Sequence, residues 1–480
     1  MSGVTPPLAG ANELCCLGGQ ELARRYRNRE LSPVEVIVAA LDRAEEIQPL
    51  FNAFTFIDRK GAIEQARASE QRWRKGEQVS AIDGVPTTIK DIVWVKGWSV
   101  RYGSLITDPT PRTEDAPSVL RLRESGAVFL GQTTTPEFGW KAVTDSPLNG
   151  VTRNPWSPDN TSGGSSGGAA VAAATGAGVL HLGTDGGGSI RIPASFTGIV
   201  GHKPTFGKVA AYPASVFGTV AHVGPMARTV GDVAIMLEAM SGCDIRDWLQ
   251  GFIQTGPDML TDDLLRRSRI GYWSKPPCGD VEPEVAAIVD AAVERIRALG
   301  AHVERVDLPG SNLLEIFQHH WFTGAANRLD SVPRELQDKI DLGLRKIAAA
   351  GKSINGSDLV AAQVKRAEFG AAMDGLLTKY DFLVSPGTAI TAFAVGQEVP
   401  KVSGLSQWSE WAGFNFPINL SQQPACVVPC GATRDGLPVS LQFVGARGAD
   451  ARVLSAAQDF ERLFPDLHLA HVELAGAYAS

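Results

Sequence analysis

The sequence predicts an α/β fold in which helices sandwich a mixed β-sheet, and two stretches of the chain support this prediction. Residues 269–308 contain a strand-like run, a long amphipathic helix pattern and a second strand-like run, the order of a βαβ crossover with parallel strands. Residues 425–445 contain two apolar runs on either side of the turn sequence TRDG, which predicts an antiparallel hairpin. The sheet is therefore expected to hold both kinds of strand pairing.

The first 80 residues are expected to form a helical layer over that sheet. Residues 32–35 supply a serine cap, a first-turn proline and a capping-box glutamate ahead of the helical apolar pattern of residues 34–47. A second stretch, about residues 60–75, is rich in Ala, Glu, Gln and Arg, which are good helix formers. Strand-like β-branched runs begin only after this layer, from Val85.

The chain is expected to fold as one domain over residues 1–480. It contains no Pro-rich spacer, charge block or low-complexity tail at which a domain boundary would fall. Within the domain, residues 1–80 are expected to form the helical layer and residues 81–210 the core that carries the chemistry. Residues 211–480 are expected to supply the remaining sheet, further helices and the loops around a substrate pocket.

Composition favours an enzyme that acts on small molecules. The net charge of −7 gives no basic surface for nucleic acid or an anionic membrane. The N-terminus lacks the pattern of a secretory signal and no apolar run is long enough to span a bilayer, so a cytoplasmic location is expected. The 6 cysteines are expected to be reduced thiols, and without a CxxC pair no metal or other cofactor is expected. A monomer or a homodimer is expected.

The most unusual stretch is residues 161–195, TSGGSSGGAAVAAATGAGVLHLGTDGGGSIRIPAS, in which two Gly/Ser loops flank an Ala-rich segment. A flexible linker is a poor explanation, because the small apolar run AAVAAA is expected to pack tightly. A phosphate-binding loop is also disfavoured. No GxxxxGK[ST] motif is present, and residues 190–192 have the pattern of a strand rather than of a helix start.

Residues 163–167 also satisfy GxSxG, the turn that presents the nucleophile of α/β-hydrolases. That motif requires a strand before it, but residues 153–161, with two prolines, are expected to form a loop. It also requires an acid and a histidine. The candidate histidines are His181, His202, His222, His302, His319, His320, His468 and His471. A Ser-His-Asp hydrolase therefore stays open as an alternative.

The segments GGSSGG and GTDGGGSIRIPAS together resemble the signature of the amidase signature family, and GVPTTIKD at residues 84–91 resembles that family's lysine segment. The segments occur in the family's order, with Ser189 lying 24 residues after Ser165 and Lys90 lying 75 residues before it. The similarity continues over nearly the whole chain. It implies the amidase signature fold and a serine hydrolase that needs neither histidine nor metal.

This resemblance also implies a role for each site residue. Ser189 is the nucleophile that forms an acyl-enzyme, Ser165 is a bridging serine in a cis peptide, and Lys90 is the base. The oxyanion hole is implied to be the backbone N–H groups of Gly186, Gly187, Gly188 and Ser189. Consecutive glycines let the main chain curl so that such groups converge on one point. Asp185 and Arg191 flank this loop and are expected to brace it, or to form an ordinary buried ion pair.

A lysine base must be neutral, whereas an unperturbed ammonium group with a pKa of about 10.4 is neutral in only about one molecule per thousand near neutral pH. Burial among the apolar residues between Val85 and Val93 is expected to lower the pKa of Lys90 by about three units. Turnover is then expected to rise toward mild alkalinity. The alternative is that Lys90 pairs with Asp91 or another carboxylate at the surface.

Three aromatic-rich segments, residues 138–147, 319–324 and 406–416, are expected to border the substrate pocket. They suit an apolar or aromatic acyl or amine group, although core packing is the commoner role of such side chains. The aromatic side chains concerned are Trp321, Phe322, Trp408, Trp411, Phe414 and Phe416. The predicted reaction is hydrolysis of the carbon–nitrogen bond of a small amide, and carbamates (urethanes) and esters stay open as substrates.

A different member of the same family is the glutamyl-tRNA amidotransferase A-type protein, which acts within a complex that passes ammonia to a charged tRNA. That relative has a segment like GGSIRQPA, where this chain reads GGSIRIPA at residues 187–194. A stand-alone hydrolase is therefore favoured, and the glutamyl-tRNA amidotransferase remains an alternative.

Overall fold

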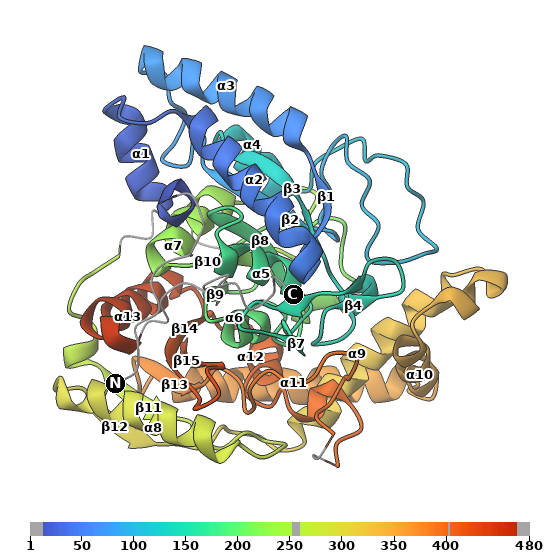
Figure 1. Ribbon diagram of the computed structural model, residues 1–480. Coiled ribbons are helices and arrows are strands. Elements are labelled where there is room, and N and C mark those ends of the chain that lie inside the picture. Colours follow the sequence, from blue (N-terminus) through green and yellow to red (C-terminus); the bar gives the residue numbers. More distant parts are fainter. Residues whose placement is uncertain (1–12, 252–259, 402–403, 468–480) are drawn as a thin grey trace.

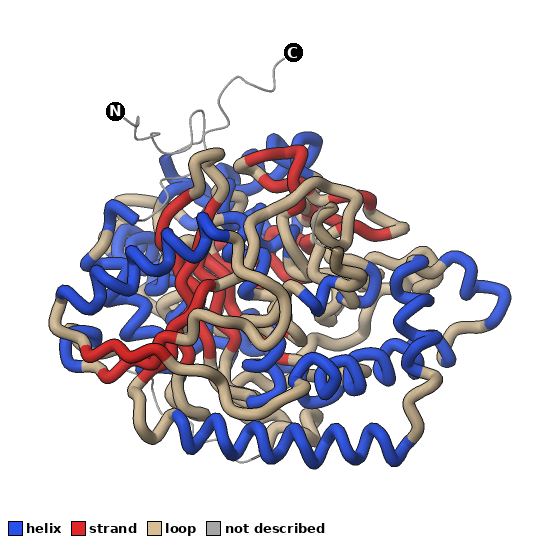
Figure 2. The backbone as a smooth tube through the Cα atoms, turned by 90° about the horizontal axis from the view of Figure 1, so that it is seen from below, coloured by secondary structure: helices blue, strands red, loops and turns tan. Residues whose placement is uncertain are grey.

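The computed structural model describes residues 13–251, 260–401 and 404–467, and its centre is a mixed sheet of 11 strands. The strand order across this sheet is β1-β3-β2-β8-β10-β9-β14-β15-β13-β11-β12. Helices cover both faces of the sheet, which is the α/β/α sandwich that the sequence predicts (Figure 1). In the perpendicular view the strands form the middle layer, with helices on either side (Figure 2).

The strands of the main sheet alternate with helices along the chain. They are β1 (Phe54–Ile57), β2 (Pro86–Lys90), β3 (Val128–Thr133), β8 (Leu180–Asp185), β9 (Val200–Lys203), β10 (His222–Ala227), β11 (Arg269–Tyr272), β12 (His302–Arg305), β13 (Phe382–Pro386), β14 (Ala425–Ala432) and β15 (Pro438–Val444). Two small sheets lie apart from it. They pair β4 (Asp145–Ser146) with β5 (Gly150–Val151) and β6 (Arg153–Asn154) with β7 (Ser157–Thr161).

Both kinds of strand pairing occur in the main sheet, as the sequence predicts. Strands β11 and β12 pair in parallel on either side of α8 (Pro283–Ala298), which confirms the βαβ crossover. Strands β14 and β15 pair antiparallel, which confirms the hairpin. Strand β2 pairs in parallel with both β3 and β8. The carboxyl ends of β2 and β8 therefore meet at one edge of the sheet, the place where ligands bind in open α/β sheets.

One face of the sheet is covered by α1 (Gly19–Arg27), α4 (Pro117–Glu124), α7 (Val230–Met240), α8 and α13 (Asp450–Leu463), whose apolar side chains share one core with it. The other face is covered by α2 (Pro33–Phe51), α3 (Arg59–Lys75), α5 (Gly167–Thr175), α6 (Arg191–Thr197), α9 (Leu313–Asp330), α10 (Leu342–Gly351), α11 (Gly356–Leu376) and α12 (Phe416–Ser421). Strand β14 shows the alternation directly, because Cys426 and Val428 face the first core and Val427 faces α5 and α6.

The two predicted N-terminal helices form, but the expectation that strands begin only after them is wrong, because β1 lies between α2 and α3 and pairs with β3 in the main sheet. Helix α2 begins at Pro33 with Ser32 as its cap, and Glu35 completes the capping box. Helix α3 covers Arg59–Lys75, close to the predicted stretch. Both helices pack over β3 through one cluster of apolar side chains. The C-terminal half of α2 packs against α5 through another such cluster. Helix α2 thus covers α5, the Ala-rich segment between the two glycine-rich loops.

Two further local predictions are wrong. Residues 190–192, expected to be strand-like, lie at the start of helix α6. The carboxylate of Asp185 accepts the N–H groups of Ile190 and Arg191, and Pro193 falls in the first turn, where its missing N–H costs nothing. Residues 153–161, expected to be a loop, form the hairpin of β6 and β7. The two prolines do not interrupt this hairpin. It has only two strands, so a backbone N–H that is missing at its outer edge breaks no hydrogen bond between strands.

Candidate active site

Lys90 is the last residue of β2, and its side chain is fully buried. Its Nζ lies 2.7 Å from Ser165 Oγ, 2.9 Å from Ser166 Oγ and 3.0 Å from Thr184 Oγ1. All three partners are hydroxyl groups, which can accept a hydrogen bond from an amine or donate one to it. The amine is thus held in an uncharged, hydrogen-bonded cage at the carboxyl edge of the sheet.

This setting favours the neutral amine. Burial lowers the pKa of Lys90 well below its ordinary value of 10.5, and the more distant charge of Asp185 opposes the effect only in part. Ser166 is the cap residue of α5, so the amine also lies at the positive end of that helix. The interpretation of Lys90 as a partner of Asp91 is wrong, because the Asp91 carboxylate instead accepts the N–H groups of Arg101 and Gly103.

The two serines of the GGSSGG segment connect Lys90 to the second glycine loop. The peptide bond between Gly164 and Ser165 is cis, as the family resemblance implies for the bridging serine. The Ser166 hydroxyl donates to the carbonyl of Thr184, and the Ser166 N–H donates to the carbonyl of Ser189 at 3.1 Å. Ser165 and Ser189 both line one pocket. The first loop therefore places a lysine-bonded hydroxyl next to the segment that carries Ser189.

Ser189 lies in the turn between β8 and α6, and its side chain is 5% exposed. Its hydroxyl makes no hydrogen bond with any residue that the structure describes, so it is free to meet a ligand in the pocket. The N–H groups of Gly186, Gly187 and Ser189 likewise have no acceptor in the described part of the chain. Three backbone donors are therefore available around this hydroxyl.

The implied role of Gly188 in the oxyanion hole needs correction. Its N–H donates to Asp185 Oδ1 at 2.8 Å, so this donor is already used. Gly188 serves the loop in another way. Its φ of 125° is open to glycine but not to other residues, and a Cβ atom there would lie 2.6 Å from Ile192. The third glycine shapes the turn, and the first two are left with free N–H groups.

Asp185 and Arg191 form the brace that the sequence predicts. Two hydrogen bonds, at 2.9 and 3.0 Å, join the Arg191 guanidinium to the Asp185 carboxylate, and both side chains are fully buried. Burial raises the pKa of Asp185, but the Arg191 guanidinium outweighs it and holds the pKa below its usual range. Asn419 and Gln442 satisfy further polar atoms of the pair. A buried ion pair with every partner in place is rigid, and here it fixes the glycine turn.

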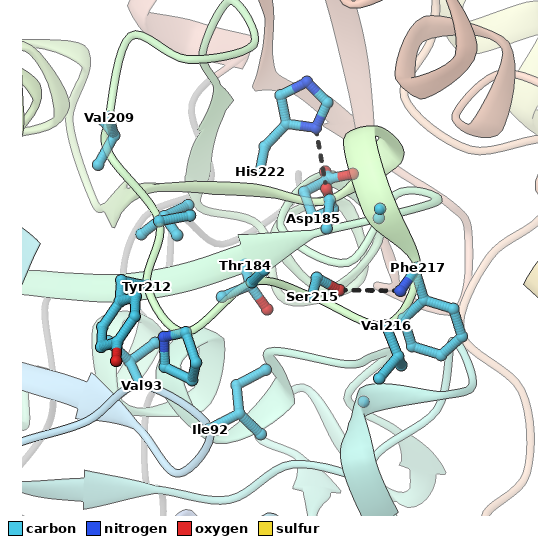
Figure 3. Close-up of a pocket in the computed structure, with 18 of the residues that line it drawn as sticks. Ile92, Val93, Thr184, Asp185, Val209, Tyr212, Ser215, Val216, Phe217 and His222 are labelled. Carbon is cyan, nitrogen blue, oxygen red and sulfur yellow. Dashed lines mark hydrogen bonds between the residues drawn. The ribbon is translucent and has the colours of Figure 1, made fainter. Parts of the chain in front are cut away.

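A pocket of about 170 Å³ opens over Ser165, Ser189 and Thr184. The loop of residues 205–218 contributes Tyr212, Val216 and Phe217 to the lining, on either side of Thr184 in the view of Figure 3. Ile92 and Val93 also line the pocket, and Val93 lies beside Tyr212. The lining is mostly apolar, with a few convergent polar groups, which is the character of a small-molecule site.

The aromatic residues predicted for the pocket divide into two groups. Trp321 lines it and stacks on Phe217 with ring centroids 3.7 Å apart. Five others do not line it, and the prediction for them is wrong: Phe322, Trp408, Trp411, Phe414 and Phe416. They are buried in the core between α9, α12 and the sheet. Large aromatic side chains in a polar-flanked segment pack into the core whenever their element turns them that way.

Several residues of the site were missed by the sequence analysis. Ser166 and Thr184 bond the lysine, and the 205–218 loop forms a pocket wall. Thr184 follows from strand register, since β8 pairs with β2 and both strands end at this edge. The loop carries no signal of its own, because its position depends on contacts with distant segments.

The histidine-dependent alternative is not supported by the geometry. Among the described residues, no histidine hydrogen-bonds to Ser165 or Ser189. His181 bonds to Thr88, His202 to Asp450, and His222 to the carbonyl oxygens of Val220 and Asp185. His468 and His471 lie outside the described residues. All 6 cysteines lie in the described part of the chain and are free thiols. Among the described residues, no group of acidic, histidine or cysteine side chains is arranged to hold a metal ion.

None of the described helices is long and apolar enough to cross a membrane.

Comparison with known proteins gives one consistent family. The amidase family model matches residues 35–454. An acylamidase from Rhodococcus erythropolis is 35% identical over 457 residues, covering 94% of this chain and 96% of that protein. The A-type component of glutamyl-tRNA(Gln) amidotransferase from Chloroflexus aggregans is 32% identical over 481 residues, covering 93% and 96%.

Solved structures agree with the sequence relatives. A bacterial aryl acylamidase of the amidase signature family superposes with a TM-score of 0.86 at 28% identity, covering 94% of this chain and 98% of that one. A 6-aminohexanoate cyclic dimer hydrolase superposes with a TM-score of 0.84 at 26% identity, covering 95% and 98%. With a family match over most of its length and the fold of these enzymes, the chain belongs to the amidase signature family and is a hydrolase of non-peptide carbon–nitrogen bonds.

Proposed function

We propose that this chain alone hydrolyses small apolar or aromatic amides, with Ser189 as nucleophile, Ser165 as proton relay and Lys90 as base. One observation supports this most strongly. A fully buried amine lies 2.7 Å from the Ser165 hydroxyl, and Ser165 lines the same pocket as the unbonded Ser189 hydroxyl. An amine in this position can take a proton through the serine that lies between it and the pocket.

The proposed reaction proceeds in two stages. Neutral Lys90 takes the proton of the Ser165 hydroxyl as Ser165 takes the proton of Ser189, and the Ser189 oxygen attacks the amide carbonyl carbon. The proton then returns through Ser165 to the leaving nitrogen, the carbon–nitrogen bond breaks, and an acyl-enzyme remains on Ser189. Water attacks that ester with the same relay, which releases the acid and restores the serine.

The glycine turn would stabilise the charge that develops on the carbonyl oxygen. The unpaired N–H groups of Gly186, Gly187 and Ser189 are the proposed donors. A single such donor lowers the barrier by about 2.7–4 kcal/mol, so the turn would supply a major part of the rate enhancement. The ion pair of Asp185 and Arg191 supports this role, because donors are effective only when the protein holds them in place beforehand.

The pocket and the relatives both favour an amide with an apolar or aryl group. The lining residues Ile92, Tyr212, Val216, Phe217 and Trp321 are apolar or aromatic. An acylamidase and an aryl acylamidase are among the similar proteins. Carbamates and esters stay open as further substrates, because the acyl-enzyme chemistry is the same. A cytoplasmic location, a monomeric or dimeric state and one domain over residues 1–480 remain predictions.

A second candidate function is that of the A-type amidotransferase component, which the relatives of that name favour. One experiment separates the two. The purified chain, without partners, is assayed on anilides, aliphatic amides, carbamates and esters, with Ser189→Ala as the inactive control. Turnover of any amide by the chain alone, and labelling of Ser189 by a fluorophosphonate probe, are expected. Activity that appears only within a complex with charged tRNA would favour the amidotransferase.

A further inference from the structure

Arg328 is a charged pocket residue that the proposed reaction does not use. It lies in the last turn of α9, is half-buried, and lines the pocket. Its guanidinium forms no ion pair and no hydrogen bond with any described residue, and its Nε is buried without a partner. Buried or half-buried arginines are normally paired, because desolvating a charge is costly. An unpaired guanidinium in a pocket therefore points to a ligand that supplies the missing acceptor.

The other charged groups that line the pocket are already satisfied. Asp185 is paired with Arg191. The Asp247 carboxylate accepts the N–H groups of Ala211 and Leu249. Arg328 is thus the one pocket-lining charge whose partner is missing from the described part of the chain.

Arg328 contacts Phe138, which precedes a residue next to the proposed relay serine, Ser165. Its guanidinium carbon is 4.8 Å from the ring centroid of Phe138. The next residue along the chain is Gly139, and a Cβ atom there would be 3.3 Å from Ser165 Oγ. The segment of Phe138 and Gly139 therefore borders both the cation and the relay serine. A planar substrate could lie along this ring with its amide near Ser189 and its far end near the guanidinium.

Tyr102 adds a second donor beside Arg328. It lines the pocket, its ring centroid is 5.9 Å from that of Phe138, and its hydroxyl accepts a hydrogen bond of 2.7 Å from Trp94. The hydroxyl proton is donated to no acceptor in the described residues. A phenol whose oxygen is already an acceptor can still donate its proton. Tyr102 and Arg328 both line the pocket and both contact the Phe138 ring, so their donors belong to one wall.

The backbone under these two aromatic residues is strained. Tyr102 has φ of 56° and Phe138 has φ of 54°, in the left-handed region that bulky residues avoid. The Phe138 N–H donates to the Tyr102 carbonyl at 2.8 Å, which holds the two turns together. Strained residues of this kind persist where the surroundings impose them, and they concentrate at ligand sites. This wall of the pocket has the features of a built binding surface.

We propose that Arg328 and Tyr102 form an anion subsite that binds a carboxylate carried by the substrate, at the end of the pocket away from Ser189. This rests on the proposed amidase function and narrows it to aryl amides that bear a carboxylate on the ring. One guanidinium matches the single charge and two oxygens of a carboxylate, and Phe138 provides a face for the ring. A neutral amide would leave the guanidinium unpaired in the pocket.

The test compares matched pairs of substrates. The values of kcat/KM are measured for 3- and 4-acetamidobenzoate and for the corresponding methyl-substituted acetanilides, and the carboxylate-to-methyl ratio is taken for each enzyme. In Arg328→Met this ratio is expected to fall about 10- to 100-fold, the loss typical of a charge-assisted hydrogen bond. Arg328→Lys keeps the charge and is expected to lose less. The ratio cancels any common effect on folding or chemistry.

Arg297→Met is the matched control, since Arg297 also lies in the last turn of a helix, α8, and is not a pocket residue. Its ratio is expected to equal that of the unmodified enzyme. A ratio that stays within about twofold of the unmodified value in Arg328→Met would overturn the anion subsite, because a charge-assisted contact is worth more than that.

A binding experiment tests the subsite independently of turnover. Benzoate and benzyl alcohol are titrated into the enzyme by calorimetry. Benzoate is expected to bind more tightly, and Arg328→Met is expected to remove the difference. If no amide is turned over but benzoate binding depends on Arg328, the proposed amidase function fails and the anion subsite stands. Equal binding of benzoate to the unmodified enzyme and to Arg328→Met would overturn the subsite whatever the activity.

Discussion

Two lysines of this protein are buried to the same extent and differ in what surrounds them. Lys90 ends strand β2 and Lys203 ends strand β9, and both side chains are fully buried. Burial lowers the pKa of each well below its ordinary value. Lys90 contacts three hydroxyl groups, whereas Lys203 contacts two carbonyl oxygens, those of Pro204 at 3.0 Å and Gln423 at 2.5 Å.

The difference in partners separates the proposed base, Lys90, from a structural cross-link, Lys203. A carbonyl oxygen only accepts hydrogen bonds. The two carbonyl oxygens around Lys203 therefore bind an amine that donates, but they carry no proton that could be transferred. A hydroxyl both donates and accepts, so the Lys90 cage accommodates the charged and the neutral amine. Lys203 joins the end of β9 to the segment before β14, and Lys90 joins a strand end to a pocket. Burial alone therefore does not distinguish the proposed base from the structural lysine, whereas the hydrogen-bonding partners of the two amines differ.

The largest expected effect is on turnover. Lys90→Met should lower kcat by at least about 10³-fold, because the proposed base is removed and no other amine bonds Ser165 in the described part of the chain. Lys203→Met should keep the kcat of the unmodified enzyme per folded molecule. Both variants are assayed on an anilide at saturation, with the folded fraction measured by circular dichroism. Loss of turnover in both variants to the same degree would remove the distinction between the two lysines.

The free energy of unfolding should fall more in Lys203→Met than in Lys90→Met, the reverse of the order expected for turnover. Lys203→Met leaves the carbonyl oxygens of Pro204 and Gln423 without their donor in a buried site, which costs about 1–3 kcal/mol of unfolding free energy. Lys90→Met should cost less, because the Ser166 hydroxyl keeps its bond to the Thr184 carbonyl and a buried amine is removed. Urea unfolding followed by circular dichroism measures both values. A larger loss in Lys90→Met would contradict the assignment of Lys203 as the cross-link.

The pH dependence of kcat/KM should follow Lys90. Its pKa is lowered from 10.5 by burial, and the active form is the neutral amine, so activity rises with pH through the lowered pKa and then levels off. Below that pKa the rate should change about tenfold for each pH unit. The plateau should therefore begin well below pH 10.5. Lys203→Met should leave the profile unchanged, and a rise that continues to pH 10.5 would show that Lys90 is not desolvated in solution.

The similarity of the two lysines also shows what the sequence can reveal. Both follow short strand-like runs, and no local pattern separates them. The family resemblance identified Lys90 together with Ser165 and Ser189, because the order and spacing of three motifs carry information that one residue lacks. The alternation of strands and helices was likewise readable, since hydrophobic periodicity is a local property. The βαβ unit, the hairpin and the N-terminal helices all form where the pattern places them.

The pocket depends on contacts between distant segments, and there the sequence was less informative. Phe322, Trp411 and Phe414 are as aromatic as Trp321, yet only Trp321 reaches the pocket. Which face of a helix meets the pocket is decided by packing, not by residue type. The sequence also could not predict which acceptor the Gly188 N–H binds. The same GGG run is compatible with an N–H that faces the pocket or with one that donates to Asp185. Spacing reveals the chemical groups, and tertiary contacts decide which of their atoms are free.

The smallest expected effect tests a single member of the Lys90 cage. Thr184→Val keeps the shape of the side chain and removes the hydroxyl 3.0 Å from Nζ. Since that hydroxyl accepts from the charged amine, its loss should lower the pKa of Lys90 further and move the rising limb of kcat/KM to lower pH. Loss of one bond, about 0.5–1.5 kcal/mol, should reduce the plateau roughly 3- to 10-fold. Thr88→Val is the matched control, because it removes a buried hydroxyl of β2 that bonds to His181 and not to Lys90. A limb that moves equally in both variants would mean that the Thr184 hydroxyl does not act on the lysine, and the three-hydroxyl cage would then be structural.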